Sequence, residues 1–433
     1  MLIAGLLIAC TAFQAEERAA APPNFLIVLM DDVGRDKIGL YGVGKDPPPT
    51  PHLDALAAQG VVFRRTWAYH ACSPTRAALL TGRYSDRTGI GGVVKPDDDR
   101  NTPLALSEHL LPEDLPGYRT THVGKWHLGD TSAPLDHPIL SGFDASIGWD
   151  GPNDYFRWNE CADGKLTPKT GYFPESMAEH VIAAVTAAPA TPNEPAAPFF
   201  LYYCPKLAHV PFHDPPKEFH SQEEAPAYPL RQHKAMVETI DTLLGRILAS
   251  VDLTETYVFV LGDNGSPGHA VEPPFVIKKN KGSLYEGSLN VPMIVAGPGV
   301  AQGKTCEELV EVTDLFATVR ELSGLGPPTR GAEDSISFAP QLRDPSLPGA
   351  RAYLYVHRFP HEGAKGPDHR ALRTLRWKII EDRRAGTFEL FDLDADPYEE
   401  LDLVATPSDD EAKREEASDA RARLIALFPS FEE

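Results

Sequence analysis

The sequence predicts an α/β protein: a large mixed, mostly parallel sheet sandwiched by helices, followed by a smaller C-terminal antiparallel sheet and a terminal helix. Residues 25–30, 199–203 and 257–261 form continuous apolar runs, which suit strands that are buried on both faces. Segments with helical spacing lie between these runs, and such alternation is typical of a sheet covered on both faces. After about Pro340 the pattern changes to short strand-like segments that are separated by polar turns.

The first 21 residues have the character of an export signal or a lipoprotein leader. Residues 1–9 form a short apolar run, although no basic segment precedes it. Residues 7–10 resemble a bacterial lipobox, which would make Cys10 a lipid-anchored first residue, and ordinary cleavage near residues 19–21 is the alternative. No later run reaches the apolar length of a membrane span. We therefore expect an exported protein that is periplasmic or secreted. A lipoprotein anchored to the membrane through Cys10 is the less favoured alternative.

Two folded parts follow the leader, a main α/β domain over residues 22–340 and a C-terminal α+β subdomain over residues 341–433. Apolar residues recur three and four apart in segments that we expect to be helices of the main domain, namely 53–58, 176–187 and 231–251. Residues 142–156 are rich in aromatic and polar side chains and are expected to form a loop. In the subdomain we expect three short strands and one helix, at 352–356, 371–380, 387–393 and 409–427.

The net charge of −21 argues against a nucleic-acid-binding protein, because such binding depends on clustered lysine and arginine. An anionic substrate would need a local cationic site against this overall field. The chain has five cysteines without zinc-ligand spacing. If Cys10 belongs to the leader and Cys72 is modified, the remaining three permit at most one disulfide.

The strongest motif is residues 72–83, which read CSPTRAALLTGR. Ser73 can cap a helix, Pro74 suits its first turn and Gly82 can end it. Cys72 is then expected at a helix N-terminus, where backbone N–H groups favour negative charge. For an isolated cysteine, a buried packing role would be the preferred interpretation.

The string Cys-x-Pro-x-Arg followed by Leu-Thr-Gly-Arg resembles the signature of the type I sulfatase family, in the alkaline phosphatase superfamily. The resemblance implies that a formylglycine-generating enzyme oxidises Cys72 to formylglycine, whose hydrate is the nucleophile. It also implies that Arg76 belongs to the catalytic group.

Two acidic pairs follow apolar runs that are predicted to be strands: Asp31-Asp32, and Asp263-Asn264. Ligands bind beyond the carboxyl ends of strands in open α/β sheets, so both pairs should face one crevice. Three carboxylates and an amide oxygen suit Ca²⁺, or Mg²⁺ as the alternative, rather than zinc. The resemblance implies the same assignment, with calcium usual and residue 72 completing the ligand set.

Three further segments supply basic residues. Residues 117–129 resemble the second sulfatase signature, which implies that Lys125 contacts the sulfate and that His127 positions or deprotonates the hydrate. A lysine and a histidine two apart would lie on one side of an extended segment. In residues 208–213 the family's His-x-Pro pattern selects His209 over His213 as the histidine that faces the leaving group, with a surface-loop histidine as the alternative.

Residues 281–288 resemble the family's Lys-Gly-x-x-Tyr-Glu-Gly-Gly segment, which implies that Lys281 is a second sulfate-binding lysine. Ser288 and Asn290 depart from the residues usual there, which puts loop shape and substrate contacts in doubt rather than the lysine.

Residues 388–401 resemble the family's C-terminal stretch, and we interpret them as a strand, a turn and a solvated face without a catalytic role.

The predicted function is hydrolysis of sulfate monoesters, with a sulfated carbohydrate as the expected substrate. Two rival hypotheses are a phosphonate or phosphodiester hydrolase of the same superfamily and a catalytically silent sulfoglycan-binding protein. Comparing hydrolysis of an aryl sulfate with that of an aryl phosphodiester separates the first. Binding without hydrolysis, despite confirmed formylglycine, would support the second.

Overall fold

The computed structural model describes residues 21–95, 102–129, 133–150, 154–188, 196–223, 228–328, 330–360 and 365–431. The predicted leader lies outside the described residues apart from residue 21, and so does Cys10 with its predicted lipid anchor. Within the described part of the chain, no helix combines the length and the apolar character needed to cross a membrane.

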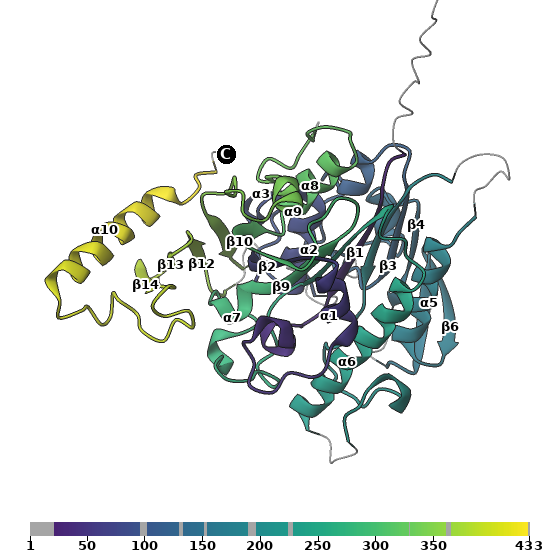
Figure 1. Ribbon diagram of the computed structural model, residues 1–433, viewed down its shortest axis with the longest axis horizontal. Helices are drawn as coiled ribbons and strands as arrows, with labels where there is room; N and C mark the ends of the chain where they lie inside the picture. Colours follow the sequence, from purple (N-terminus) through teal and green to yellow (C-terminus); the bar gives the residue numbers. More distant parts are fainter. Residues whose placement is uncertain are drawn as a thin grey trace, which may run out of the picture.

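A ten-stranded sheet forms the centre of the molecule (Figure 1). From edge to edge the strands are β10 (Lys304–Glu311), β2 (Gly60–Trp67), β9 (Asn290–Ala296), β8 (Thr256–Gly262), β1 (Asn24–Met30), β7 (Phe199–Cys204), β3 (Arg119–Gly124), β4 (Ala145–Asp150), β5 (Arg157–Ala162) and β6 (Lys165–Thr170). The five neighbours from β8 to β4 are parallel, whereas β9, β5 and β6 run antiparallel to their neighbours. The predicted fold class is confirmed. The loop predicted for residues 142–156 is wrong in part, because β4 occupies six of them.

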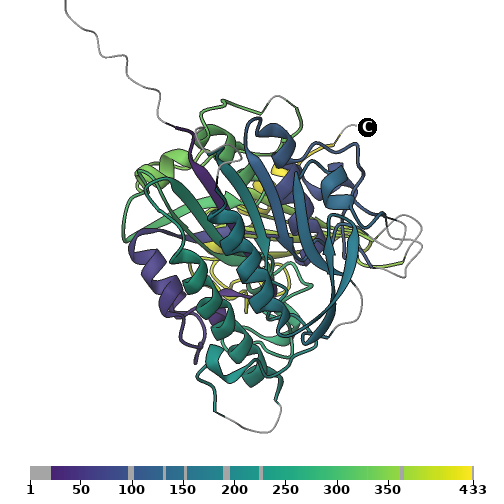
Figure 2. The same ribbon diagram turned by 90° about the vertical axis from the view of Figure 1, so that its right-hand side faces the viewer.

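Helices cover both faces of this sheet. On one face lie α1 (Pro51–Ala58), α5 (Phe173–Val185) and α6 (Pro229–Leu248), seen in front of the strands in Figure 2. The other face carries α2 (Cys72–Thr81), α8 (Asp314–Leu322) and α9 (Ala339–Arg343). The shorter elements are α3 (Ser85–Thr88), α4 (His137–Leu140), α7 (Glu286–Leu289), and 3₁₀ turns at Arg35–Lys37, Gly39–Tyr41, Leu111–Asp114, Lys217–Phe219 and Ile277–Lys279.

Burial on both faces explains the continuous apolar run in β1. Leu26 and Val28 pack into the core on the α6 side, and Ile27 and Leu29 pack on the α2 side. Successive side chains of a strand point to opposite faces, so a central strand needs apolar residues at every position.

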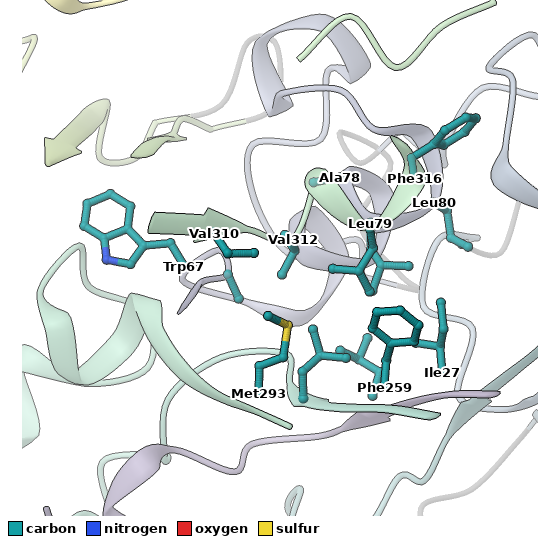
Figure 3. Close-up of a cluster of buried hydrophobic side chains, with 14 of the residues drawn as sticks. Ile27, Trp67, Ala78, Leu79, Leu80, Phe259, Met293, Val310, Val312 and Phe316 are labelled. Atoms are coloured by element: carbon teal, nitrogen blue, oxygen red, sulfur yellow. The ribbon is translucent and has the colours of Figure 1, made fainter. Parts of the chain in front are cut away.

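Helix α2 packs against the sheet through its C-terminal part. Figure 3 shows Leu79 and Leu80 of α2 beside Ile27 and Phe259 of the sheet, and all four are fully buried. Burying one such side chain contributes about 1.5–3 kcal/mol. The C-terminal part of α2 is thereby held against the strands, and its N-terminal residue, Cys72, is buried.

The C-terminal part forms a four-stranded antiparallel sheet with a helix, at the left of Figure 1. Its elements are β11 (Leu354–Arg358), β12 (His369–Arg373), β13 (Trp377–Asp382), β14 (Thr387–Asp392) and α10 (Glu411–Leu427). The single strand predicted over residues 371–380 is wrong. A turn, in which Thr374 N–H donates to the Trp377 carbonyl (2.8 Å), divides it into two strands. The boundary near residue 340 stays a prediction.

The solvated face predicted within residues 388–401 is also wrong at one position. Glu399 is 1% exposed, and its carboxylate lies 2.6 Å from the Lys378 ammonium. Lys378 also pairs with Glu286 of α7 (3.3 Å), and Glu286 pairs with Arg373 of β12 (2.6 Å). These four residues, called the docking cluster below, join the small sheet to the main one.

Candidate active site

Two acidic pairs lie side by side at the carboxyl ends of adjacent strands. β1 and β8 are parallel, with Met30 opposite Gly262, so Asp31-Asp32 and Asp263-Asn264 follow at the same level. Asp32 N–H donates to Asp263 Oδ1 (3.0 Å), and the Asn264 amide nitrogen donates to Asp32 Oδ1 (2.8 Å). Asp32 has a φ of 60°, a left-handed conformation that reverses the chain directly after β1. All four side chains are buried in one place.

Cys72 is the first residue of α2 and is 1% exposed. Its thiol donates to Asp31 Oδ1 (3.5 Å) and lies 3.7 Å from Lys281 Nζ. Burial raises the pKa of Cys72 to about 12, although Lys125 and Lys281 oppose the change. The unmodified thiol is therefore neutral near pH 7 and is a poor nucleophile.

The ends of α2 differ in part from the prediction. Ala71, not Ser73, is the N-cap residue, and no side chain caps the helix. The Ser73 hydroxyl instead accepts a hydrogen bond from Val94 N–H (3.1 Å), so it anchors a neighbouring segment. Gly82 ends the helix with a φ of 64°, as predicted.

Three cationic side chains pair with the three carboxylates. Arg76 is fully buried and donates to Asp263 Oδ2 (3.0 Å) and to the Lys125 carbonyl (2.7 Å). Lys125 Nζ donates to Asp31 Oδ2 (2.7 Å), and Lys281 Nζ donates to Asp32 Oδ1. Burial alone would raise the pKa of Asp31, but the charges of Lys125 and its neighbours hold it well below its usual value. Burial and the charge of Asp31 raise the pKa of Asp263.

The donor atoms fit a hard divalent cation. Asp31, Asp32, Cys72 and Asp263 each offer one ligand atom within 4.8 Å of the others. Asn264 Oδ1 is buried without a hydrogen-bond partner, which is costly for an amide oxygen unless something binds it. Carboxylate and amide oxygens are the ligands that Ca²⁺ and Mg²⁺ prefer.

Two histidines border this group. His127 has a φ of 59° and follows the end of β3, so the extended segment predicted there stops at Gly124. Its Nδ1 is buried without a partner, and burial together with Lys125 lowers its pKa well below the usual value. An atom of His209 lies within 4.8 Å of ligand atoms of Asp31 and Cys72, whereas His213 stacks on Tyr155 with ring centroids 4.1 Å apart.

The structure thus brings together every residue that the sequence selected for the site, on loops after β1, β3, β7 and β8, on α2, and on the segment before α7. Three contributors were missed. Thr75 donates its hydroxyl to the Asp263 carbonyl (2.6 Å), and His233 Nε2 lies 3.0 Å from the Asp32 carbonyl. Lys206 is buried beside the site, three residues before His209, and this closeness in sequence to a predicted site residue was the one signal that could have found it.

Known families account for most of the chain. The profile of the family described as Sulfatase matches residues 23–325. The chain belongs to the sulfatase family. A second profile, described as the C-terminal part of N-sulphoglucosamine sulphohydrolase, matches residues 279–422 of this sulfatase.

Among curated relatives, N-acetylgalactosamine-6-sulfatase of Sus scrofa is 32% identical over 389 residues, which cover 81% of this chain and 72% of that one. The human protein of the same name is 32% identical over 374 residues, which cover 78% and 69%. Of the solved structures, Ps i-CgsB in complex with k-i-k-neocarrahexaose has a TM-score of 0.77 at 24% identity, covering 93% of this chain and 92% of that one. BT4656 in complex with D-glucosamine-2-N,6-O-disulfate has a TM-score of 0.75 at 19% identity, covering 95% and 100%. At these identities the solved structures support the fold.

Proposed function

We propose that this sulfatase hydrolyses sulfate monoesters of a carbohydrate, with a formylglycine made from Cys72 and a bound Ca²⁺. The observation that carries the proposal is the position of Cys72. It lies at the N-terminus of a helix, within hydrogen-bonding distance of one acidic ligand candidate and 3.7 Å from a lysine ammonium. A cysteine with only a packing role would not need charged groups around its sulfur.

Charge balance supports an anionic substrate. Three carboxylates and three cationic side chains cancel, so a divalent cation leaves the site with two positive charges. A sulfate monoester carries one negative charge and would be attracted locally, although the whole chain carries −21. Magnesium would give the same balance, but four oxygen donors on buried loops suit the looser coordination of calcium.

Asp31, Asp32, Asp263 and Asn264 would hold the calcium, with residue 72 as a further ligand. When bound, the cation favours ionisation of an adjacent hydroxyl and stabilises negative charge on oxygen. A formylglycine at position 72 would supply, as its hydrate, two hydroxyl groups on one carbon: one could act as the nucleophile toward sulfur, and loss of a proton from the other would allow sulfate to leave. Serine and unmodified cysteine lack the second group.

The chain's own residues would divide the remaining work. Lys125 and Lys281 can leave their carboxylate partners for the sulfate oxygens once the cation neutralises those carboxylates. His209 is half-buried at the rim of the site and would pass a proton to the departing alcohol oxygen, a role worth about 10²–10⁴-fold in rate. His127 would accept a hydroxyl proton when sulfate leaves.

Sulfate release from a defined panel tests the proposal. The panel contains 4-nitrophenyl sulfate, N-acetylgalactosamine 6-sulfate, glucosamine 2-N,6-O-disulfate and an aryl phosphodiester, and the protein is co-expressed with a formylglycine-generating enzyme. Wild type should release sulfate catalytically from at least one sulfate ester. Cys72→Ala should lose at least about 10⁴-fold in kcat, as expected when a nucleophile is removed.

Cys306→Ala is the matched control, because Cys306 is a buried cysteine on the edge strand β10 and should leave the rate within about threefold. Equal turnover by Cys72→Ala and wild type would refute the proposal. Faster hydrolysis of the phosphodiester than of every sulfate ester would assign the site to the rival reaction.

A further inference from the structure

A cavity of about 310 Å³ opens beside the candidate active site. Lys125, His127 and His209 border it on the side of Cys72, so a group in the cavity adjoins the residues proposed to act on the scissile bond. The cavity lies at the lower end of the range for small-molecule sites. Its place beside His209, the proposed proton donor to the departing alcohol, makes it a site for the leaving-group portion of the substrate.

The polar lining of the cavity is basic. Two lysines contribute to it, and no described residue of the lining is aspartate or glutamate. Burial lowers the pKa of His122, His127 and His209, so these histidines of the lining add no positive charge near neutral pH. This local composition is the opposite of the whole chain, which has 62 acidic and 41 basic residues. A concave site whose charged groups are lysines favours a ligand of negative charge.

Part of the lining of the cavity is apolar. Trp126, Pro134, Leu135 and Pro138 contribute to it. Apolar and aromatic surface with a few polar groups is typical of sites that bind a ring and fix its orientation. The cavity therefore combines a surface for a ring with cations for an acidic substituent.

Lys206 is the cation of this cavity that the catalytic proposal does not use. It is 5% exposed, and its ammonium lies 5.3 Å from the centre of the Tyr155 ring. The Tyr155 hydroxyl lies 2.9 Å from the Lys206 carbonyl and 3.1 Å from the His209 carbonyl, so one side chain holds both residues in place. Burial, with the nearby Lys125, lowers the pKa of Lys206 to about 7. An anionic group bound beside this ammonium would offset the cost of its charge.

We infer that Lys206 binds a second acidic group of the substrate, a carboxylate or a second sulfate, on the leaving-group ring that occupies this cavity. The inference rests on the proposed function. It assigns Lys206 a part in substrate selection rather than in bond cleavage.

A matched pair of aryl sulfates tests the charge preference, namely 3-carboxyphenyl sulfate and its neutral counterpart 3-carbamoylphenyl sulfate. The quantity measured is the ratio of kcat/KM for the acid to kcat/KM for the amide. Differences in leaving-group reactivity cancel when this ratio is compared between variants, because every variant meets the same two substrates. Wild type should favour the acid, and Lys206→Met should lower the ratio by about tenfold or more, as expected for a hydrogen bond to a charged group.

Lys206→Arg should retain most of the preference, which a merely structural lysine would not require. Lys304→Met is the control, since Lys304 is an exposed lysine at the start of β10, and its ratio should equal that of wild type. A second set of substrates distinguishes a second sulfate from a carboxylate as the acidic group that Lys206 binds. It compares glucosamine 2-N,6-O-disulfate with glucosamine 6-sulfate, and a 6-sulfated disaccharide containing glucuronate with its carboxyl-reduced form.

Lys206→Met could lose its preference for the more acidic substrate in one of the two sugar pairs and keep it in the other. That result would support the inference and identify the acidic group as a sulfate or a carboxylate. The same ratios in wild type, Lys206→Met and Lys206→Arg would overturn the inference while leaving sulfatase turnover intact. Absence of turnover on every sulfate ester would instead overturn the proposed function.

Discussion

The molecule contains two buried clusters of opposite charges that resemble each other in chemistry and differ in surroundings. The site cluster comprises Asp31, Asp32 and Asp263 with Arg76, Lys125 and Lys281. The docking cluster comprises Glu286 and Glu399 with Arg373 and Lys378. Formal charge cancels in both.

The difference lies in what adjoins each cluster. All four residues of the docking cluster are buried, each at most 3% exposed. Trp67 donates its indole N–H to Glu286 (3.0 Å). The site cluster adjoins a cavity and includes a lysine whose side chain is 19% exposed, and the amide oxygen of the adjacent Asn264 has no hydrogen-bond partner. Balanced charge alone therefore does not mark an active site. The site cluster differs from the docking cluster in the cavity that adjoins it and in the candidate metal ligand Asn264, whose buried amide oxygen has no hydrogen-bond partner.

The largest expected effect comes from breaking the site cluster. Lys281→Met should lower kcat/KM by about 10²–10³-fold, since it removes a cation that would stabilise charge on the sulfate. Its melting temperature should change by less than about 3 °C, because Lys281 is partly exposed. Steady-state kinetics and thermal melts on one preparation measure both. A large loss of stability with unchanged kinetics would assign Lys281 a structural role.

The reverse outcome is expected for the docking cluster. Lys378→Met should lower the free energy of unfolding by about 3–5 kcal/mol, because it leaves the buried Glu399 carboxylate without its paired cation. Urea unfolding measures the loss, and kcat at a temperature where the variant is folded should stay within about threefold of wild type. Stability equal to that of wild type would show that the cluster is not needed for docking.

Metal binding should distinguish the clusters further. Adding Ca²⁺ at about one hundred times its dissociation constant to chelator-treated protein should stabilise it by about 2.7 kcal/mol. Lys378→Met should retain the calcium-induced rise in melting temperature, and Asp263→Asn should lose most of it. A rise of equal size in Asp263→Asn would place the calcium elsewhere.

The smallest expected effect is a pH dependence of stability from Glu399. Burial, with the nearby Glu286, raises the pKa of Glu399 to about 7. The folded protein therefore holds a proton that the unfolded chain releases near pH 4.5, and this contribution is lost as pH rises from about 4.5 through 7. Glu399→Gln should reduce the fall in stability over this range by an amount on the order of 1 kcal/mol, measured by urea unfolding. An identical pH profile in the variant would contradict this assignment.

Much of the fold and the position of the site could be predicted because residues that directly follow parallel strands meet at the same edge of the sheet. Asp31-Asp32 and Asp263-Asn264 follow apolar runs, and the carboxyl ends of parallel strands share one edge. Helix spacing likewise predicted α1, α5 and α6.

Three side chains were misread for one reason, which is that the role of each depended on a contact distant in sequence. Ser73 has the chemistry of a cap but bonds to Val94. Glu399 lies in an acidic run yet is buried by contact with Lys378, 21 positions earlier. Lys206 carried no signal of its own, because burial and its distance from the ring of Tyr155 arise only when β7 and the segment before β5 are brought together.

The central claim is that residue 72 performs chemistry that an unmodified cysteine cannot perform. The fraction of residue 72 that is modified can be compared with the rate of sulfate release. Preparations with different extents of modification are digested with trypsin, and the peptide of residues 66–76 is quantified by mass spectrometry. The rate of sulfate release should rise in proportion to the fraction of formylglycine and extrapolate to zero when none is present. Full multiple turnover by protein that carries only the free thiol at Cys72 would contradict the account.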